Sequence, residues 1–352
     1  FTKNIFEMII NKKVESLKLG KVIISNSSKP KIIAEAAVEH LGSLEVAKKM
    51  ALEAKKIGID FIKYQMHLPE YEMLPNKIKF WGGSLDQILE KYNLSVKDHS
   101  ILIDYCKKIG IQYLCTPFCA KAIDVLNDLG VDGFKIGSGE LTNIPMIERL
   151  IKIKKPFIIS SGMSSLEEID KIVTFIKKRT SRFVLMNCTS LYPCPYDKIN
   201  LGLINYFKTK YNILIGHSDH TPDIATAIGS VCSGASVVEK HFTLNRSLKG
   251  PDYEVSIEPK EFKDLVKINK KIYLSKGTVK KIHKDEKKVK NWANHSIVSN
   301  KNIKKGQKIS KDMICVKRPK LGINSIDFYK TIGRKAKKNI KKNQPIFWKD
   351  LN

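Results

Sequence analysis

Histidines close to apolar runs are the first residues whose types suggest chemistry. The stretches GHSDH (216–220) and VVEKHF (237–242) contain His217, His220 and His241. Neutral imidazoles bind divalent transition metals, and two of them with open coordination positions suit a catalytic cation better than a closed structural zinc. We expect His220 and His241 to bind such a cation if neighbouring strands carry them. His217 is expected to be structural or to support a ligand from behind.

Two lysines, Lys63 and Lys135, lie inside otherwise apolar runs of strand character. An unpaired ammonium is costly in such surroundings, so a bound phosphate or carboxylate would account for both. The short loops KIGSGE and SSGM are rich in glycine and serine, and their backbone N–H groups and hydroxyls can cradle an anion. The alternative is an ion pair with Glu35 or Glu140, and the two explanations are compatible.

The elements that would position these residues alternate regularly from residue 31 onward. Short apolar runs typical of strands are separated by amphipathic stretches typical of helices, such as 44–58, 166–178 and 258–277. The eight runs are 31–36, 61–65, 111–115, 133–137, 156–160, 183–187, 213–216 and 236–240. Eight units over about 245 residues match a (β/α)8 (TIM) barrel, an α/β fold with a parallel sheet. A doubly wound open sheet is the alternative, disfavoured because no glycine-rich dinucleotide loop follows the first run.

Active sites of such barrels lie at the C-terminal ends of the strands. Polar residues stand at that end of every run in this chain. They are Glu35, Lys63, Gln65, Thr116, Lys135 to Glu140, Ser160, Ser161, Asn187 to Thr189, Ser218 to His220, and Glu239 to His241. A nearly complete ring of this kind is not expected by chance, and it predicts that the histidines and lysines share one catalytic site.

The rest of the chain divides by composition and pattern. The expected segments are an N-terminal extension (1–30), the barrel (31–277), a linker (278–294) and a small β-rich module (295–352). The linker is charged and poorly patterned, whereas the module has short β-like runs and a Lys-Lys-Gly turn. An insertion at 66–100 separates the second and third runs, and WGGS (81–84) within it is predicted as an irregular loop.

The net charge of +28 comes from 63 Lys and Arg residues against 35 Asp and Glu. Because 57 of the 63 are Lys and only 6 are Arg, a general lysine bias explains the charge better than specific nucleic-acid binding does. No stretch approaches ~18 uninterrupted apolar residues, and Glu7 interrupts the apolar run IFEMII, so neither membrane insertion nor secretion is expected. The seven cysteines lack metal-site spacing and predict reduced thiols in a cytoplasm.

The ring residues, in this order, resemble the sialic acid synthase family, enzymes that condense phosphoenolpyruvate with an N-acetyl amino sugar. The matching stretches are IIAEAAVEHLGSLEVAKKM, DFIKYQMH, CTPF, FKIGSGELTNIP, KPFIISSGM, NCTSLYP, GHSDHT, VVEKHFTL and KGPDYEVSIEP. In the tail, IVSNKNIKKG and VKRP resemble the antifreeze-like (SAF, β-clip) domain that ends these synthases. The resemblance covers nearly everything from residue 31 to 352.

The resemblance implies roles for individual residues. A divalent cation, manganese or else magnesium or cobalt, would bind His220 and His241, and Glu35 and Glu140 would flank the reacting carbons. The phosphate of phosphoenolpyruvate would be held by Lys63, Thr116, Lys135, Ser138, Ser160, Ser190 and Ser218. The sugar would contact Gln65, Tyr192, Asp252 and, from the tail, Arg318. Ser190 stands where some members have an asparagine.

The implied reaction is attack of C3 of phosphoenolpyruvate on the sugar aldehyde, with a cation polarising the aldehyde and a carboxylate directing water to C2. N-acetylmannosamine and diacetamido sugars are both candidate substrates. The family also implies a domain-swapped homodimer in which Arg318 completes the partner's site. Two alternatives remain open: a synthase for other 3-deoxy-2-keto sugar acids, and a non-catalytic relative that binds sugars or polyanions.

Overall fold

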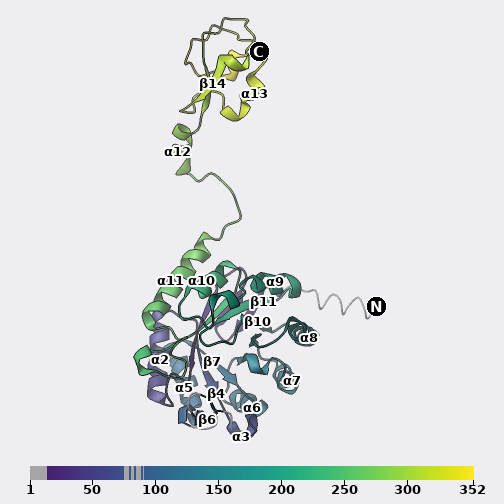
Figure 1. Cartoon of the computed structure of the whole chain (residues 1–352), viewed down its shortest axis with the longest axis vertical. Helices are drawn as coiled ribbons and strands as arrows, with labels where there is room; N and C mark the ends of the chain where they lie inside the picture. Colours follow the sequence, from purple (N-terminus) through teal and green to yellow (C-terminus); the bar gives the residue numbers. More distant parts are fainter. Residues whose placement is uncertain (1–13, 75–78, 81–82, 85–88, 90) are drawn as a thin grey trace, which may run out of the picture. The chain divides into compact units, whose positions relative to one another are not determined.

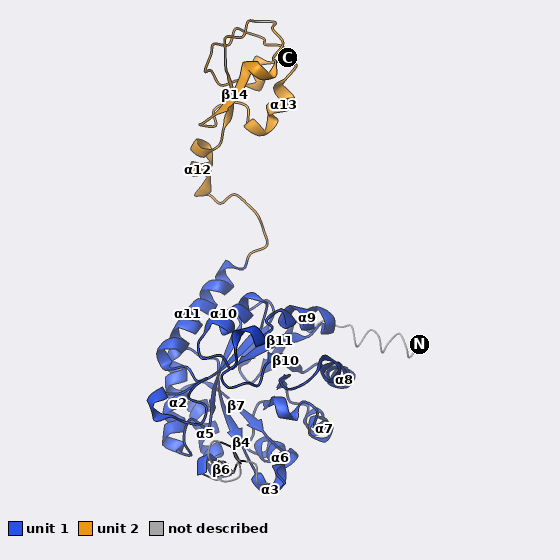
Figure 2. Cartoon of the chain, viewed as in Figure 1, with its two compact units in different colours: residues 1–276 blue, residues 277–352 orange. Residues whose placement is uncertain are grey.

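The computed structural model describes residues 14–74, 79–80, 83–84, 89 and 91–352. The chain divides into two compact units, residues 1–276 and 277–352, which Figure 2 colours blue and orange. Each unit has its own hydrophobic core, so each is described by itself.

Unit 1 is a barrel of eight parallel strands with helices around it (Figure 1). The strands are β3 (Lys31–Ala37), β4 (Phe61–Met66), β7 (Gln112–Pro117), β8 (Phe134–Ile136), β9 (Phe157–Ser160), β10 (Phe183–Cys188), β11 (Leu214–Asp219) and β12 (Val237–His241). Their order around the sheet follows the chain, β12 pairs with β3, and contacts between β7 and β8 bring the ring close to closure. The predicted (β/α)8 barrel is confirmed, and an open sheet is excluded because the first and last strands pair.

Helices cover the outer face of the strands, and their ends carry the expected signals. They are α2 (Leu44–Ile57), α5 (Val96–Ile109), α6 (Ala120–Asp128), α7 (Ile144–Ile153), α8 (Leu166–Lys177), α9 (Gly202–Tyr211), α10 (Ala225–Cys232) and α11 (Pro259–Ser275). Ser43 caps α2 by accepting a hydrogen bond from the Val46 N–H, and Gly58 ends this helix with a φ of 88°. Ser165 and Glu168 form a capping box at the start of α8.

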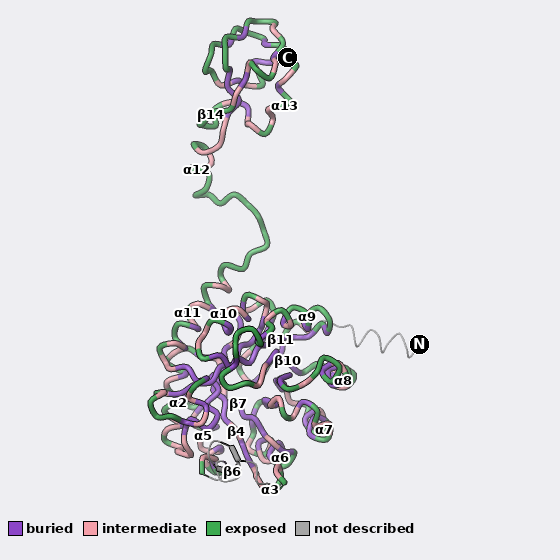
Figure 3. Tube along the Cα trace, viewed as in Figure 1, coloured by how far each residue is buried: buried purple, intermediate pink, exposed green. Residues whose placement is uncertain are grey.

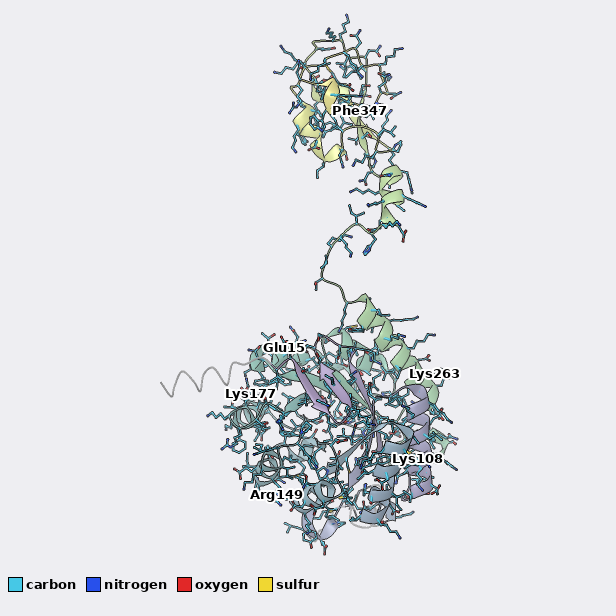
Figure 4. All side chains as sticks on the ribbon, turned by 180° about the vertical axis from the view of Figure 1, so that it is seen from behind. Glu15, Lys108, Arg149, Lys177, Lys263 and Phe347 are labelled. Atoms are coloured by element: carbon cyan, nitrogen blue, oxygen red, sulfur yellow. The ribbon has the colours of Figure 1, made fainter. Side chains whose placement is uncertain are left out.

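The outward faces of these helices carry part of the basic charge. Lys108 on α5, Arg149 on α7 and Lys263 on α11 are exposed, and Figure 4 labels them on the helices that surround the barrel. Charged side chains on solvated helix faces need no bound ligand to account for them. Among the described residues, no helix combines the length and apolar content needed to cross a bilayer.

An N-terminal hairpin closes the end of the barrel opposite the predicted site. β1 (Ser16–Leu19) and β2 (Val22–Ser25) pair antiparallel across a turn at Gly20, whose φ is 58°. Leu17, Leu19 and Ile24 are buried in one cluster with residues from the first halves of the strands, namely Ile33, Phe61, Leu114, Ile158, Val184, Leu214 and Val237. Residues 16–25, predicted as part of an extension at 1–30, instead belong to the barrel unit because they bury this apolar face.

The insertion between β4 and β7 contains short elements. α3 (Pro69–Glu72) follows β4, and β5 (Lys79–Phe80) pairs antiparallel with β6 (Gly83–Ser84) before α5. The first two residues of WGGS lie outside the described residues, and its last two form β6, where an irregular loop was predicted. The described part of unit 1 also contains the short 3-10 helices η1 (Ser138–Glu140), η2 (Tyr196–Lys198) and η3 (Arg246–Leu248).

Unit 2 is a small module with little regular secondary structure. β13 (Ser296–Ser299) pairs antiparallel with β14 (Ile314–Lys317), and α13 (Phe328–Thr331), η4 (Lys311–Met313), η5 (Ser325–Asp327) and η6 (Trp348–Asp350) surround them. Its core consists of Ile297, Ile303, Ile309, Ile314, Ile323, Ala336, Ile340, Ile346 and Leu351. Residues 274–289 are exposed, as the green tube of Figure 3 shows. The segment predicted as a linker also contains α12 (Glu286–Ala293).

Candidate active site

The C-terminal mouth of the barrel brings both predicted lysines to one carboxylate. Lys63 Nζ lies 2.7 Å from Glu35 Oε2 and 3.1 Å from Glu239 Oε1. Lys135 Nζ lies 3.4 Å from the same Glu239 oxygen. All four side chains are buried. The two ammonium groups and two carboxylates therefore form one charge cluster inside the barrel, which is called the lysine cluster below.

Strand register explains why these residues meet. Glu35 of β3 is paired with Lys63 of β4 on one side and with His241 of β12 on the other. Residues paired across neighbouring strands point to the same side of the sheet. Glu239 stands two positions before His241 and therefore faces the same way as His241. Glu35 thus lies between the lysine cluster and a candidate metal ligand.

Glu239 belongs to the predicted ring, but its contact with both lysines was not predicted. Of the two carboxylates considered as alternative partners of the lysines, Glu35 pairs with Lys63, whereas Lys135 pairs with Glu239. The available signal was the two-residue spacing from His241 within a strand, which puts both side chains inside the barrel.

Hydroxyl groups complete the lysine cluster. Lys135 Nζ donates to Ser160 Oγ at 2.7 Å, and Ser218 Oγ donates to Glu239 Oε1 at 2.9 Å. Thr116 Oγ1 is buried and has no hydrogen-bond partner in the described part of the chain. A buried hydroxyl without a partner is unfavourable, and an oxyanion bound at the lysines would satisfy it.

A second group of hydroxyls gathers at the ends of β8, β9 and β10. The Gly162 N–H donates to Ser138 Oγ at 3.1 Å, and Ser138 Oγ donates to Cys188 Sγ at 3.4 Å. A Cβ at Gly162 would lie only 2.3 Å from Ser190 Oγ and 2.6 Å from Ser138 Oγ, so any larger residue here would displace these hydroxyls. The structure therefore brings Ser138 and Ser190 together although they are distant in sequence.

Burial and mutual attraction set the ionisation of the lysine cluster. Burial opposes a charge on Glu239, but Lys135, Lys63 and the Ser218 hydroxyl outweigh it and lower the pKa of Glu239 to about 2. Burial lowers the pKa of Lys63 to about 7. The attraction of Glu239 opposes this change, and the repulsion of Lys135 adds to it. A further anion would favour the charged form of Lys63.

Replacing Lys63 or Lys135 with methionine should raise the KM for phosphoenolpyruvate roughly tenfold to a hundredfold, the value of a hydrogen bond to a charged group. The KM for the sugar should change less. Because the pKa of Lys63 is about 7, the wild-type KM for phosphoenolpyruvate should rise as its ammonium loses the proton above that pH. Lys63→Met should remove this inflection and Lys135→Met should retain it. Steady-state kinetics against pH make the measurement.

The matched control is Lys171→Met on the exposed face of α8, which should leave both KM values unchanged. A wild-type KM for phosphoenolpyruvate in both cluster variants would reassign Lys63 and Lys135 to structural ion pairs.

The two candidate metal ligands face one another at the same mouth. The ring centroids of His220 and His241 are 5.3 Å apart. His220 Nδ1 lies 2.8 Å from the Thr189 carbonyl oxygen, which leaves its Nε2 for a ligand. His241 Nδ1 lies 3.5 Å from Asp252 Oδ2 and has no hydrogen-bond partner in the described part of the chain. A partner on the other nitrogen is usual for metal-binding histidines because it fixes the ring. The donor set fits a divalent cation with open positions.

The groups around the two histidines bear on the number of metal ligands and on the charge of His241. Among the described residues, no set of three or more His, Cys, Asp or Glu side chains is arranged to hold a metal, so two imidazoles are the ligands supported here. Burial, followed by His220, lowers the pKa of His241 well below its usual range, which keeps that imidazole neutral for ligation. The Tyr192 ring lies 4.1 Å from the His220 ring and 5.6 Å from the His241 ring. Tyr192 therefore stands beside both.

Two buried groups connect the C-terminal ends of β10, β11 and β12. His217 is fully buried, its Nδ1 lies 3.1 Å from the Asn187 carbonyl oxygen, and burial lowers its pKa to about 4. Asp219 and Lys240 are paired in register, and Lys240 Nζ lies 3.4 Å from Asp219 Oδ1 with neither side chain exposed. This pair ties together the strands that present His220 and His241.

Not every predicted site residue joins these groups. Gln65 does, because its Nε2 donates to Glu35 Oε1 at 2.9 Å. Glu140 is half-buried, and its recorded hydrogen bond is accepted from Asn143 Nδ2 at 2.8 Å. Arg318 belongs to unit 2, where its guanidinium lies 5.8 Å from the centroid of a tryptophan ring, Trp292.

Two different protein-family models match the two parts of the chain. The NeuB family model matches residues 50–281 and the SAF domain model matches residues 294–352. An N,N'-diacetyllegionaminic acid synthase of Campylobacter jejuni is 36% identical over 90% of this chain and 98% of its own. The N-acetylneuraminate-9-phosphate synthase of Homo sapiens is 30% identical over 90% of each chain.

Among solved structures, the N-acetylneuraminic acid synthetase of Leptospira borgpetersenii, in complex with citrate, is 31% identical and superposes with a TM-score of 0.72. The superposition covers 79% of this chain and 96% of the synthetase chain. Since the family model matches most of the chain, including Lys63, Lys135, Glu239 and both histidines, and relatives of 30% identity or more cover 90% of it, the chain belongs to the NeuB family of sialic acid synthases and carries a SAF domain at residues 294–352.

Proposed function

We propose that this chain condenses phosphoenolpyruvate with an N-acetylated amino sugar, giving a nine-carbon 2-keto sugar acid and phosphate. The observation that carries the proposal is one barrel mouth in which Lys63, Lys135 and Glu239 lie beside His220 and His241. Two buried ammonium groups next to a two-histidine site suit a phosphate ester that reacts with a carbonyl compound. The synthase names of relatives at 36% and 30% identity support this reaction.

The lysine cluster is the proposed site for the phosphate of phosphoenolpyruvate. Lys63 and Lys135 supply two ammonium groups, and the partnerless Thr116 hydroxyl supplies a donor. Ser160 and Ser218 hold the cluster from either side. The serines at the ends of β8 and β10, Ser138 and Ser190, extend the same polar surface. Charge-assisted hydrogen bonds of this kind bind phosphate oxygens strongly.

The histidine pair is the proposed site for the metal and the sugar aldehyde. A divalent cation at His220 and His241 would supply a Lewis acid for the aldehyde oxygen of the open-chain sugar. Manganese is the proposed ion, with magnesium and cobalt as alternatives. Tyr192 beside both rings and Asp252 beside His241 are placed to contact the sugar.

Glu35 is the carboxylate that the geometry favours for the chemical step. C3 of phosphoenolpyruvate forms a bond to the aldehyde carbon, and positive charge develops at C2. Glu35 stands in register between Lys63 and His241, where it can stabilise this charge and orient a water molecule onto C2. Water adds to C2 and gives one proton to Glu35, and the former aldehyde oxygen takes up a proton to become a hydroxyl. The tetrahedral centre then loses the proton of its new hydroxyl as the C2–O bond to phosphate breaks, which leaves a 2-keto group and inorganic phosphate. Glu140 makes its recorded contact with Asn143 instead.

The test is phosphate release from phosphoenolpyruvate with manganese and a panel of sugars, followed by mass spectrometry of the product. Release should require the enzyme, the metal and an N-acetylated amino sugar together. Aldose phosphates without an N-acetyl group form a separate arm, because turnover with these alone would indicate a synthase of other 3-deoxy-2-keto acids. Absence of release with every sugar would remove the proposal and favour a binding protein.

We favour a sugar with two acetamido groups over N-acetylmannosamine. Relatives at 36% and 32% identity are named N,N'-diacetyllegionaminic acid synthases. Phosphoenolpyruvate contributes three carbons and no nitrogen, so a product with two N-acetyl groups requires a sugar that already has both. Comparison of kcat/KM for the two sugar types in the same assay decides between them.

A domain-swapped homodimer is proposed, in which Arg318 enters the partner's barrel. The exposed stretch 274–289 provides length for such an exchange. In isolated heterodimers of His220→Ala and Arg318→Ala chains, the swap leaves one whole site, so roughly half of the wild-type activity should return. Homodimers of either variant are the controls and should be nearly inactive. Inactive heterodimers would show that each tail serves its own barrel.

The cytoplasm is the proposed location. All seven cysteines are free, and five are buried. Thiols used as small apolar side chains are typical of proteins from reducing compartments.

A further inference from the structure

A line of buried and half-buried polar side chains runs outward from Glu35. Gln65 Nε2 donates to Glu35 Oε1 at 2.9 Å. On the other side of this amide, Gln65 Oε1 lies 3.2 Å from His67 Nε2. The second ring nitrogen, His67 Nδ1, lies 2.8 Å from Glu72 Oε1. Three elements contribute to the line: β3 holds Glu35, β4 and the residue after it hold Gln65 and His67, and α3 holds Glu72.

The direction of each hydrogen bond follows from the groups that take part. An ionised carboxylate only accepts, so Gln65 must turn its NH2 toward Glu35 and its oxygen toward His67. His67 Nε2 must then carry a hydrogen and donate it. Its Nδ1 faces the Glu72 carboxylate, which also only accepts, so both ring nitrogens are donors, as in the charged form of histidine. A half-turn of the amide would place its oxygen against the Glu35 carboxylate and its NH2 against the donor of His67. Both bonds would be lost, so His67 selects one orientation of Gln65.

The His67 ring is itself held from several directions. It stacks on Phe118 with ring centroids 4.1 Å apart and an interplanar angle of 16°. Its backbone oxygen accepts a hydrogen bond from Asn93 Nδ2 at 2.8 Å. The Leu68 N–H donates to Glu72 Oε2 at 3.1 Å, which fixes the carboxylate that faces the ring. The side chains of His67 and Glu72 are 8% and 6% exposed, so water competes little with these contacts.

We infer that His67, held by Glu72, is a positioning residue for the reaction, because it locks the amide of Gln65 and thereby the carboxylate of Glu35. The inference rests on the proposed function, in which Glu35 acts at C2 of phosphoenolpyruvate, and on the sugar contact that the family resemblance implies for Gln65. Neither His67 nor Glu72 contacts the lysine cluster or the histidine pair through any recorded bond among the described residues. Their effect must therefore pass through Gln65.

His67→Phe tests the inference, because phenylalanine retains the stacking on Phe118 but removes both ring nitrogens. kcat/KM for the sugar should fall roughly tenfold to a hundredfold, as expected for loss of a hydrogen bond next to a charged group. The KM for phosphoenolpyruvate should stay near the wild-type value. Glu72→Gln should give a smaller loss in the same direction, and His67→Gln, which retains a donor, should recover part of the loss.

A double-mutant cycle separates positioning from a general structural role. In a Gln65→Ala background, His67→Phe should change kcat/KM by less than about twofold, because the amide that it positions is gone. The matched control is His283→Phe at an exposed site of unit 2, which should be neutral in both backgrounds. An equal loss in both backgrounds, or an equal rise in both KM values, would overturn the inference.

Thermal unfolding of the same four proteins gives a readout that does not need turnover. His67→Phe should destabilise the wild type more than it destabilises Gln65→Ala. Additive effects on Tm would count against the contact even in an active enzyme. If the wild type turned over no sugar but the effects of the two substitutions on Tm were not additive, the proposed function would be wrong. The contact between His67 and the Gln65 amide would still be supported.

Discussion

His220→Ala and His241→Ala should each lower kcat by about a thousandfold or more, since a Lewis acid contributes several kcal/mol to the barrier. The reason is that each ring has a nitrogen that a cation could bind, and the two ring centroids lie only 5.3 Å apart. Prolonged chelation of the wild type should abolish turnover, and manganese, magnesium or cobalt should restore it. Binding of Mn²⁺ measured by electron paramagnetic resonance should be lost in both variants.

The control is His283→Ala, an exposed histidine of unit 2, which should retain activity and metal binding. Circular dichroism and Tm establish that the site variants remain folded. Full activity of a wild-type sample shown to be free of metal would rule out the metal site, and so would unchanged Mn²⁺ affinity in both histidine variants.

Glu35→Gln should lower kcat by a factor of about a hundred to ten thousand, the usual contribution of a carboxylate that directs water and stabilises developing charge. Glutamine keeps the shape but removes the ion pair of Glu35 with Lys63, while both lysines retain Glu239 as a partner. The KM for phosphoenolpyruvate should consequently change little. Glu140→Gln should cost less than about tenfold, because its recorded hydrogen bond is to Asn143 and not to the cluster.

The matched control is Glu167→Gln, an exposed carboxylate on α8 that pairs with Lys171. It should leave kcat and both KM values unchanged. A larger loss in Glu140→Gln than in Glu35→Gln would transfer the chemical role to Glu140, and equal losses would assign both carboxylates to the reaction.

The local pattern of the sequence was sufficient to predict the barrel fold and the end of the barrel at which the predicted site residues lie. Apolar runs alternating with amphipathic stretches gave eight strands and their helices because burial on both faces demands continuous apolar residues. A residue at the end of such a run, such as Lys63 or His220, must then lie at the C-terminal mouth. The N-terminal hairpin escaped prediction, since the apolar face of Leu17 and Leu19 is too short to show a period.

The pairing of the site residues was decided by the tertiary structure alone. An ion pair with Glu35 or Glu140 was the alternative considered for the two lysines, but Lys135 meets Glu239, which is about a hundred residues distant. The sequence determined which residue types reach the mouth of the barrel. Only the register of β12 against β3 and β11 could decide that Glu239 faces both lysines and that Glu35 stands beside His241. Register depends on the packing of whole strands, and a shift by one residue would turn every one of these side chains away from the barrel interior.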